Sequence, residues 1–329
     1  MIRIGVVGVG HLGQHHARKF LSIQGCELKG IHDRNPDRAA QISEALGVKS
    51  YPTYEDLLTD IDAIDIAATT TWHYALAKTA LQAGKHVFLE KPITSELKEA
   101  EELVAIAEQK GLIIQVGHIE RYNPVILEVE REIKDPMFIE SHRISSFQHR
   151  GTDVPVVLDL MIHDIDLVLS FIKSPITEIR ANGVGIFTSS IDIANARLQF
   201  ANGAIANVTS SRVALKQERK LRIFQRDKYI SLDFQTKHAT VIKRSADIAR
   251  LLPLLMMGNT GIKPEQLVDK TEYDVADSPK DALSTELESF VNCLNQGSRP
   301  VVDGTAGMRA LQVALEIIQR IQNQDQTHI

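Results

Sequence analysis

The chain begins with an apolar run that leads directly into a glycine-rich turn. Residues 2–7 are almost entirely apolar, as in a strand buried on both faces of a parallel sheet. The turn that follows reads Gly8-Val9-Gly10-His11-Leu12-Gly13, and residues 12–24 then predict a helix that ends before Gly25. A strand, a tight turn and a helix form the first part of a β–α–β unit, which requires a second, parallel strand beside the first.

The first third of the chain repeats this alternation of strand and helix, which predicts a doubly wound parallel sheet with helices on both faces. Residues 1–122 are therefore expected to form a Rossmann domain. Such sheets bind ligands beyond the carboxyl ends of their strands. The further predicted strands are 27–33, 63–67, 86–90 and 112–116, and the further predicted helices are 35–46, 73–83 and 95–110.

The glycine turn has the spacing of a dinucleotide-binding fingerprint. One glycine makes the turn, one lets the pyrophosphate approach the backbone, and one lets helix and strand pack closely. We expect Gly8, Gly10, His11, Leu12 and Gly13 to contact the cofactor. The alternative is a tight strand–helix turn without a ligand.

The second predicted strand ends in a carboxylate, Asp33, which lies 20 residues after Gly13. That is the offset expected for an acid that accepts hydrogen bonds from the adenosine ribose hydroxyls. A carboxylate there repels a 2′-phosphate, so NAD is predicted rather than NADP. Arg34 follows directly and would partly offset that repulsion.

Residues 123–329 follow a different pattern and are expected to form an α+β domain with a largely antiparallel, open-faced sheet. Residues 200–204 and 225–228 have hairpin chemistry. Residues 246–279 lack clean periodicity and are interpreted as a loop or lid over the substrate, or as an interface segment. The last helices, 281–295 and 304–323, are expected to pack back on the first domain. Predicted strands cover 138–146, 176–186, 193–200, 204–212, 220–225 and 228–234.

Two further motifs suggest what this architecture does. Glu90-Lys91-Pro92 directly follows a predicted strand at the ligand-binding edge, and the second half contains Asp159-Leu160-Met161-Ile162-His163-Asp164-Ile165-Asp166. Together with the glycine turn, they resemble the glucose–fructose oxidoreductase / inositol dehydrogenase (Gfo/Idh/MocA) family over nearly the whole chain. The resemblance implies an NAD(P)-dependent dehydrogenase that acts on CH–OH groups, with no metal. It also implies a homodimer or homotetramer built on the open sheet face.

Oxidation of a secondary alcohol requires a proton acceptor on the hydroxyl while a hydride leaves the carbon. Asp159 and His163 are four residues apart, so on a helix both point to one face. Histidine titrates near neutrality, and His163 is the expected base, with Asp159 holding its tautomer or binding a sugar hydroxyl. Lys91 is expected to polarise and position the hydroxyl; the reverse assignment stays open. The alternative for Lys91 is an ordinary exposed lysine without a catalytic role. The alternative for His163 is a histidine whose hydrogen bonds are satisfied in the core.

Family members usually carry a Pro-Asn pair in the loop that here reads Thr69-Thr70-Thr71-Trp72-His73. Thr69, Thr70 and His73 are still expected to contact the cofactor, together with Glu90 and Lys91. Trp72 either flanks the adenine or packs against the protein.

A narrower resemblance points to the subgroup of UDP-N-acetylglucosamine 3-dehydrogenases. It is carried by residues 116–124, 150–154, 158–166 and 219–232. These enzymes oxidise the sugar 3-hydroxyl so that an aminotransferase can make a 3-amino sugar for lipid A. Arg121 and Arg150 are expected to bind the substrate. Arg121 would contact a negative group, either a phosphate or a carboxylate, and the alternative is an interdomain salt bridge. Arg143, Arg150, Arg212 and Lys216 could meet the diphosphate, and the alternative for each is an ordinary surface charge.

Two rival functions remain at this point. One is a dehydrogenase of a free polyol, a sugar or another nucleotide sugar, such as the uronate of UDP-N-acetylglucosamine. The other is a non-catalytic sensor that binds a dinucleotide without turnover. Retention of Lys91, Asp159 and His163 argues against the sensor.

Composition excludes other classes of partner. The formal charge of −5 is spread along 329 residues, so no basic stripe for nucleic acid and no polybasic membrane anchor is expected. No apolar run reaches the ~20 residues that would span a bilayer. The two cysteines, Cys26 and Cys293, are far apart, and the first residues run straight into a strand pattern rather than a signal peptide. We therefore expect a cytoplasmic protein.

Overall fold

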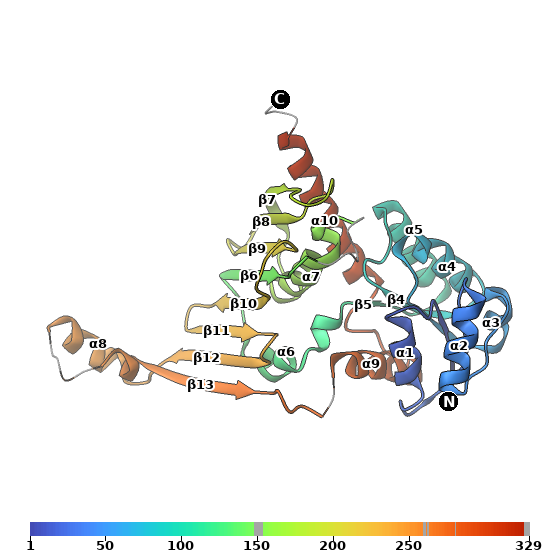
Figure 1. Cartoon of the computed structure of the whole chain (residues 1–329). Coiled ribbons are helices and arrows are strands. Elements are labelled where there is room, and N and C mark those ends of the chain that lie inside the picture. The colour runs from blue at the N-terminus through green and yellow to red at the C-terminus, as the bar shows by residue number, and fades with distance from the viewer. Residues whose placement is uncertain (148–153, 259–260, 262, 280, 326–329) are drawn as a thin grey trace. The chain divides into compact units, whose positions relative to one another are not determined.

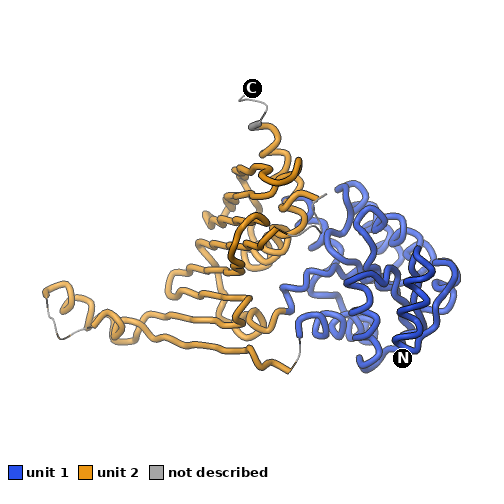
Figure 2. Tube along the Cα trace, viewed as in Figure 1, with its two compact units in different colours: residues 1–122, 280–313 blue, residues 123–279, 314–329 orange. Residues whose placement is uncertain are grey.

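The computed structural model describes residues 1–147, 154–258, 261, 263–279 and 281–325 (Figure 1). The chain divides into two compact units, which Figure 2 shows in blue and orange. Unit 1 contains Met1–Tyr122 and Lys280–Val313, and unit 2 contains Asn123–Pro279 and Ala314–Ile329.

Unit 1 is built on a five-stranded sheet in which every pair of neighbouring strands is parallel. The strand order β2-β1-β3-β4-β5 changes direction between β1 and β3. The predicted doubly wound parallel sheet is confirmed, and its ligand edge is centred where that change of direction occurs. The strands are β1 Ile2–Val7, β2 Cys26–His32, β3 Ala63–Ile66, β4 His86–Glu90 and β5 Ile114–Gly117.

Helices from both ends of the sequence cover this sheet. Phe20, Phe88 and Phe290 belong to one buried apolar cluster, so a helix near the end of the chain completes the core begun at its start. The rings of Phe88 and Phe290 meet edge to face at 5.7 Å. The helices are α1 Gly13–Phe20, α2 Pro36–Leu46, α3 Tyr54–Asp60, α4 Thr70–Gln82, α5 Leu97–Lys110 and α9 Ala282–Gln296, with a 3₁₀ turn η1 at Ile119–Tyr122.

The helices of unit 1 differ from prediction in three places. Helix α1 ends at Phe20, four residues earlier than expected, and turns lead from there to Gly25 at φ 87°. Helix α3 was not predicted because it has only seven residues, although Thr53 caps it by accepting from the Asp56 N–H. Helix α4 begins at Thr70 rather than at residue 73, because Thr69 already occupies the N-cap position.

Unit 2 is built on an eight-stranded sheet in the order β13-β12-β11-β10-β6-β9-β8-β7. All neighbours are antiparallel except β6 and β9, which run parallel. Burial alternates along β6 and β8, so one face of the sheet is covered, as the prediction requires. The strands are β6 Phe138–Ile144, β7 Ile176–Val184, β8 Ile193–Phe200, β9 Ile205–Ser211, β10 Glu218–Phe224, β11 Lys228–Asp233, β12 His238–Arg244 and β13 Val268–Asp274.

The helical elements of unit 2 are short except for the last. Those that precede β7 are α6 Pro124–Val129, the 3₁₀ turn η2 Glu130–Glu132, a π-helical turn η3 Val157–Met161, and α7 Ile162–Phe171. The final helix, α10 Gly304–Asp325, contributes its residues from Ala314 onward to this unit.

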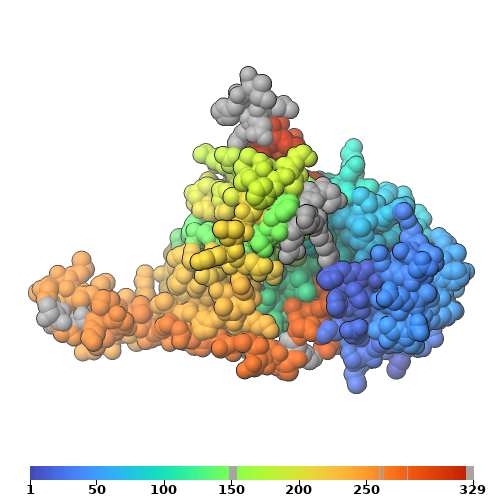
Figure 3. Space-filling model, viewed as in Figure 1, coloured from blue at the N-terminus to red at the C-terminus, as the bar shows by residue number. Residues whose placement is uncertain are grey.

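The expectation that residues 246–279 form a loop is wrong for most of that segment. It contains α8 Ile248–Met256, the 3₁₀ turn η4 Pro264–Leu267 and the edge strand β13. Strand β13 pairs in register with β12, and α8 lies at the far end of this pair (Figure 1). The atoms of α8 lie in the orange projection of unit 2 in Figure 3. Because β13 is exposed at nearly every position, its sequence carries no alternation of apolar and polar residues.

Candidate active site

The three glycines of the turn after β1 differ in what surrounds them. Gly8 has φ 84°, and a Cβ there would lie 2.8 Å from the backbone of Ala68. A Cβ on Gly13 would lie 1.9 Å from the carbonyl oxygen of Gly8. By contrast, a Cβ on Gly10 would meet nothing nearer than the Arg38 guanidinium at 3.9 Å. Gly8 and Gly13 are therefore required by the fold itself, whereas Gly10 leaves open space in front of the backbone.

Asp33 comes directly after β2 and holds this turn from its neighbouring strand. Its Oδ2 accepts from the Val9 N–H at 2.9 Å, and its Oδ1 accepts from the Asn35 N–H at 2.8 Å. The Arg38 guanidinium lies 3.8 Å from Oδ2. Each carboxylate oxygen has capacity for more than one hydrogen bond, so these contacts leave room for a ribose hydroxyl.

The exposed indole of Trp72 lies near Arg34, whose Cζ is 5.8 Å from the ring centroid. The two side chains come from the segments after β3 and β2, which both end at the ligand edge. This placement is compatible with both predictions for Trp72, that it flanks the adenine or that it packs against the protein.

Thr69 and the first turn of α4 supply exposed hydroxyls and one buried imidazole, that of His73. Thr69 makes no side-chain cap bond to α4, and its Oγ1 lies 3.4 Å from that of Thr71. His73 is buried, with Nδ1 2.8 Å from the Pro92 carbonyl oxygen and Nε2 3.1 Å from that of Ala68. Burial lowers the pKa of His73. These contacts favour a supporting role for His73 between two loops, and its direct contact with a cofactor stays a prediction.

Glu90 ends β4 and is followed by Lys91 and a cis peptide bond to Pro92. The Glu90 Oε2 accepts from the Lys91 N–H at 3.2 Å. Its Oε1 lies 3.3 Å from Nε2 of His16, whose Nδ1 lies 2.8 Å from Oδ2 of Asp65. His16 and Asp65 belong to none of the motifs recognised in the sequence. The available signal was a charged residue inside the apolar strand at residues 63–66.

In unit 2, Asp159 lies in the π-helical turn η3 and His163 lies in the first turn of α7. Both are half-buried, whereas Met161 and Ile162 between them are buried. Their spacing of four residues places both on one side of the helical segment, and single π-helical turns of this kind are frequent at functional sites.

Asp164 anchors the segment that carries His163. Its carboxylate accepts two hydrogen bonds from Arg143 on β6, at 2.7 and 3.0 Å, and both side chains are buried. Asp166 is also buried.

The other candidate cations lie in different settings. Arg212 is buried and pairs with Asp192 at 2.8 Å. Arg143 and Arg212 are therefore not surface charges, and their buried pairs argue against contact with a diphosphate. Lys216 is exposed, and Arg121 is half-buried in η1. Arg150 lies outside the described residues.

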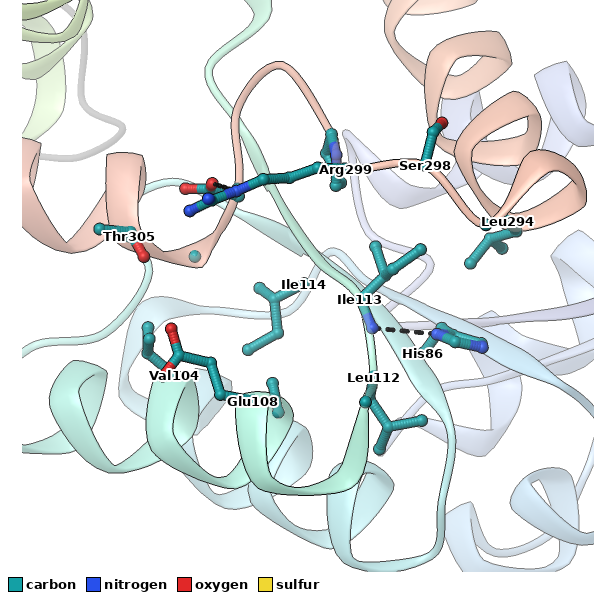
Figure 4. A pocket seen from close by; sticks show the side chains of 16 residues that line it. His86, Val104, Glu108, Leu112, Ile113, Ile114, Leu294, Ser298, Arg299 and Thr305 are labelled. Carbon is teal, nitrogen blue, oxygen red and sulfur yellow. Dashed lines mark hydrogen bonds and ion pairs between the residues drawn. The ribbon is translucent and has the colours of Figure 1, made fainter.

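A cavity of about 530 Å³ lies in unit 1, lined by His86, Glu108, Arg299 and apolar side chains that include Ile114 (Figure 4). His86 and Ile114 begin β4 and β5, so the cavity lies at the amino ends of these strands, opposite the edge that carries the glycine turn. It is therefore not the predicted cofactor site. Within the described part of the chain, no cluster of three His, Cys, Asp or Glu side chains could hold a metal ion.

The structure thus brings the cofactor candidates together within unit 1. The glycine turn, Asp33, Thr69 and Lys91 all follow the carboxyl ends of neighbouring parallel strands. Asp159 and His163 both belong to unit 2. No helix among the described residues is long and apolar enough to cross a membrane.

Comparison with known proteins agrees with this geometry. Residues 2–118 match the model of an oxidoreductase family with an NAD-binding Rossmann fold, and residues 128–230 match the Gfo/Idh/MocA C-terminal domain. UDP-N-acetylglucosamine 3-dehydrogenase from Acidithiobacillus ferrooxidans is 36% identical over 96% of both chains. A solved structure of that enzyme covers 98% of both chains at 34% identity, with a TM-score of 0.88. Myo-inositol 2-dehydrogenase from Thermotoga maritima is 25% identical over 94% of this chain and 93% of its own. The chain therefore belongs to the Gfo/Idh/MocA family of oxidoreductases, NAD(P)-dependent dehydrogenases that act on CH–OH groups.

Proposed function

We propose that the chain oxidises the 3-hydroxyl of UDP-N-acetylglucosamine, with NAD as the hydride acceptor. The observation that carries this proposal is the 36% identity to a UDP-N-acetylglucosamine 3-dehydrogenase over 96% of both chains. The motifs around Lys91 and His163, which a dehydrogenase needs and a sensor does not, support it.

The residues at the ligand edge of unit 1 fit a dinucleotide. The open space at Gly10 admits a pyrophosphate to the backbone of the turn, with His11, Leu12 and the start of α1 around it. Asp33 would accept from the ribose hydroxyls and repel a 2′-phosphate, which favours NAD over NADP. Thr69, Thr70 and Glu90 would complete the site. When bound, NAD supplies the nicotinamide ring that accepts a hydride.

The protein then has to remove the hydroxyl proton and hold the sugar. A ring nitrogen of His163 would take the proton, and Asp159 would fix the imidazole or bind a neighbouring hydroxyl. The Lys91 ammonium group would donate to the reacting oxygen and stabilise the negative charge that grows there. Arg121 and Arg150 would bind the diphosphate.

The test measures the absorbance of the NADH formed from NAD and UDP-N-acetylglucosamine. An aminotransferase is present to remove the 3-keto product. Free N-acetylglucosamine, myo-inositol and UDP-N-acetylglucosamine uronate form the comparison panel. Of these compounds, we expect only UDP-N-acetylglucosamine to be oxidised. Turnover with a free polyol or with the uronate instead would establish the rival dehydrogenase, and NAD binding without any turnover would establish the sensor.

Two variants test the assignment of roles. Lys91→Ala and His163→Ala should each lower kcat by about 10²- to 10⁴-fold. Lys98→Ala is the matched control, because Lys98 is an exposed lysine on α5. Turnover near the wild-type rate in both variants would show that the roles are assigned wrongly.

We also propose that the chain is cytoplasmic, assembles as a homodimer or homotetramer and supplies an aminotransferase in lipid A synthesis. Helix α8 exposes Leu252, Leu254 and Met256, which a second copy could cover. Light scattering should give two or four times the chain mass of 36.6 kDa. A mass of one chain would contradict the assembly.

A further inference from the structure

Three ionisable side chains that are buried or nearly buried lie in a row that ends at Glu90, the first residue of the Glu90-Lys91-Pro92 segment. His16 on α1 is 1% exposed, Asp65 on β3 is fully buried, and the side chain of Glu90 at the end of β4 is 13% exposed. The imidazole lies between the two carboxylates, with Nδ1 2.8 Å from Asp65 and Nε2 3.3 Å from Glu90. The ring of Phe88 packs on it edge to face at 5.7 Å. The row is therefore largely shielded from water, where ionic contacts are strong.

The geometry favours the imidazolium form of His16. An ionised carboxylate only accepts hydrogen bonds, and a neutral imidazole has a single N–H. Because both ring nitrogens face carboxylate oxygens, both contacts are satisfied when His16 is an imidazolium. The charges of Asp65 and Glu90 accordingly raise the pKa of His16 well above its usual 6.5, against the effect of burial.

Glu90 connects His16 to Lys91, because its carboxylate contacts both residues. Its Oε2 accepts from the Lys91 N–H, and its carboxylate also interacts electrostatically with the Lys91 side chain. The carboxylate packs against Gly117, where a Cβ would lie 3.0 Å from the Glu90 Cδ. Glycine on one side and His16 on the other thus restrict where the Glu90 carboxylate can lie. His73 and Asp65 also interact electrostatically with Glu90.

We propose that His16 is a positioning residue for Lys91. Its Nε2–H holds the Glu90 carboxylate in place, and Glu90 in turn sets the orientation and charge environment of Lys91. This inference rests on the proposed function only in assigning Lys91 to the reacting hydroxyl. A Glu90 carboxylate released from His16 would turn toward the Lys91 ammonium group, which would then hold its proton more tightly.

Two isosteric variants separate the two contacts of His16. Glutamine places its amide donor where Nε2 was, and so keeps the contact with Glu90; asparagine places its amide where Nδ1 was, and so keeps the contact with Asp65. Each variant is examined for kcat, for the Kd of NAD, and for thermal stability. The exposed neighbour His15 on the same helix provides the control, His15→Asn.

A positioning role predicts opposite rank orders for activity and stability. We expect His16→Asn to have kcat about 10- to 100-fold below that of His16→Gln, with the Kd of NAD within about threefold in both. His16→Gln should be the less stable variant, because it leaves the fully buried Asp65 without its partner. A purely structural role predicts that the less stable variant is also the less active one, and that result would overturn the proposal.

A second readout needs no sugar substrate. The rate at which acetic anhydride labels the Lys91 amine, measured by mass spectrometry across a pH series, should be about threefold to tenfold slower in His16→Asn than in His16→Gln. If labelling differs in this way while the wild type fails to oxidise the UDP-sugar, the proposed substrate is wrong and the positioning role stands. Equal labelling in the two folded variants would refute the positioning role whatever the substrate.

If either single variant fails to fold, both are made together with Asp65→Asn, which removes the buried unpaired carboxylate. The comparison between asparagine and glutamine at residue 16 is then unchanged. The same difference in kcat and in labelling is expected, and its absence would overturn the proposal.

Discussion

Replacement of Gly10 by alanine separates the requirements of the fold from those of the cofactor. The backbone at Gly10 does not have positive φ, and a Cβ there would have its nearest neighbour at 3.9 Å. The folded protein can therefore accept a methyl group at this position. Because alanine restricts the unfolded chain more than glycine does, Gly10→Ala should raise the free energy of unfolding by about 0.4–1 kcal/mol.

The same methyl group occupies the space through which a pyrophosphate would approach the turn. A displaced pyrophosphate loses a hydrogen bond between a charged group and the backbone, which contributes about 1.5–3 kcal/mol. The Kd of NAD should therefore rise by about 10- to 150-fold. Stability and affinity are expected to move in opposite directions.

The assay combines urea unfolding with calorimetric titration of NAD. Gly84→Ala is the matched control, since Gly84 lies at the C-terminal end of α4 with φ 75° and open space around it. A left-handed alanine should cost roughly 1–2 kcal/mol of stability and leave the Kd of NAD unchanged. An unchanged Kd in Gly10→Ala would refute the assignment of the turn to the pyrophosphate.

Three further predictions concern stability. Gly13→Ala should lower the free energy of unfolding by about 3 kcal/mol or more in urea, because its Cβ would lie 1.9 Å from a backbone oxygen; a loss below about 1 kcal/mol would contradict the packing. The pKa of His16 is raised in the folded protein, so the stabilisation that its protonated form provides is complete below pH 6.5 and is lost as the pH rises toward the folded-state pKa. The midpoint of urea unfolding should therefore fall more between about pH 6 and pH 9 in the wild type than in His16→Gln. Arg143→Ala should cost about 3–5 kcal/mol by leaving Asp164 buried and unpaired, whereas Arg180→Ala, in an exposed pair, should cost less than about 1 kcal/mol; equal costs would contradict the burial of the first pair.

The layout of the fold could be predicted because it depends on local patterns. Alternating strands and helices indicated the parallel sheet of unit 1, and short turns between strands indicated the antiparallel pairs of unit 2. Strand β13 was not predicted, because an exposed edge strand has no apolar face and therefore no alternation of apolar and polar residues in its sequence. Helix α3 was missed because seven residues are too few for a periodic pattern.

The supporting contacts of the site could not be predicted, because they join residues that are distant in the sequence. His16 and Asp65 are 49 residues apart and meet only once α1 packs on the sheet. The partner of Arg143 is 21 residues away, so the sequence could not distinguish a buried pair from a cation that binds a diphosphate. Residues within a local motif, such as Gly10, could be assigned a role directly.

The most direct measurement follows the hydrogen at C3 of the sugar. UDP-N-acetylglucosamine deuterated at C3 is incubated with the wild-type protein and NAD, and the reduced cofactor is analysed by mass spectrometry. If the chain oxidises the 3-hydroxyl, the NADH formed carries the deuterium. NADH without deuterium would show that another carbon is oxidised, and the absence of NADH in the presence of a competent aminotransferase would contradict the proposed reaction.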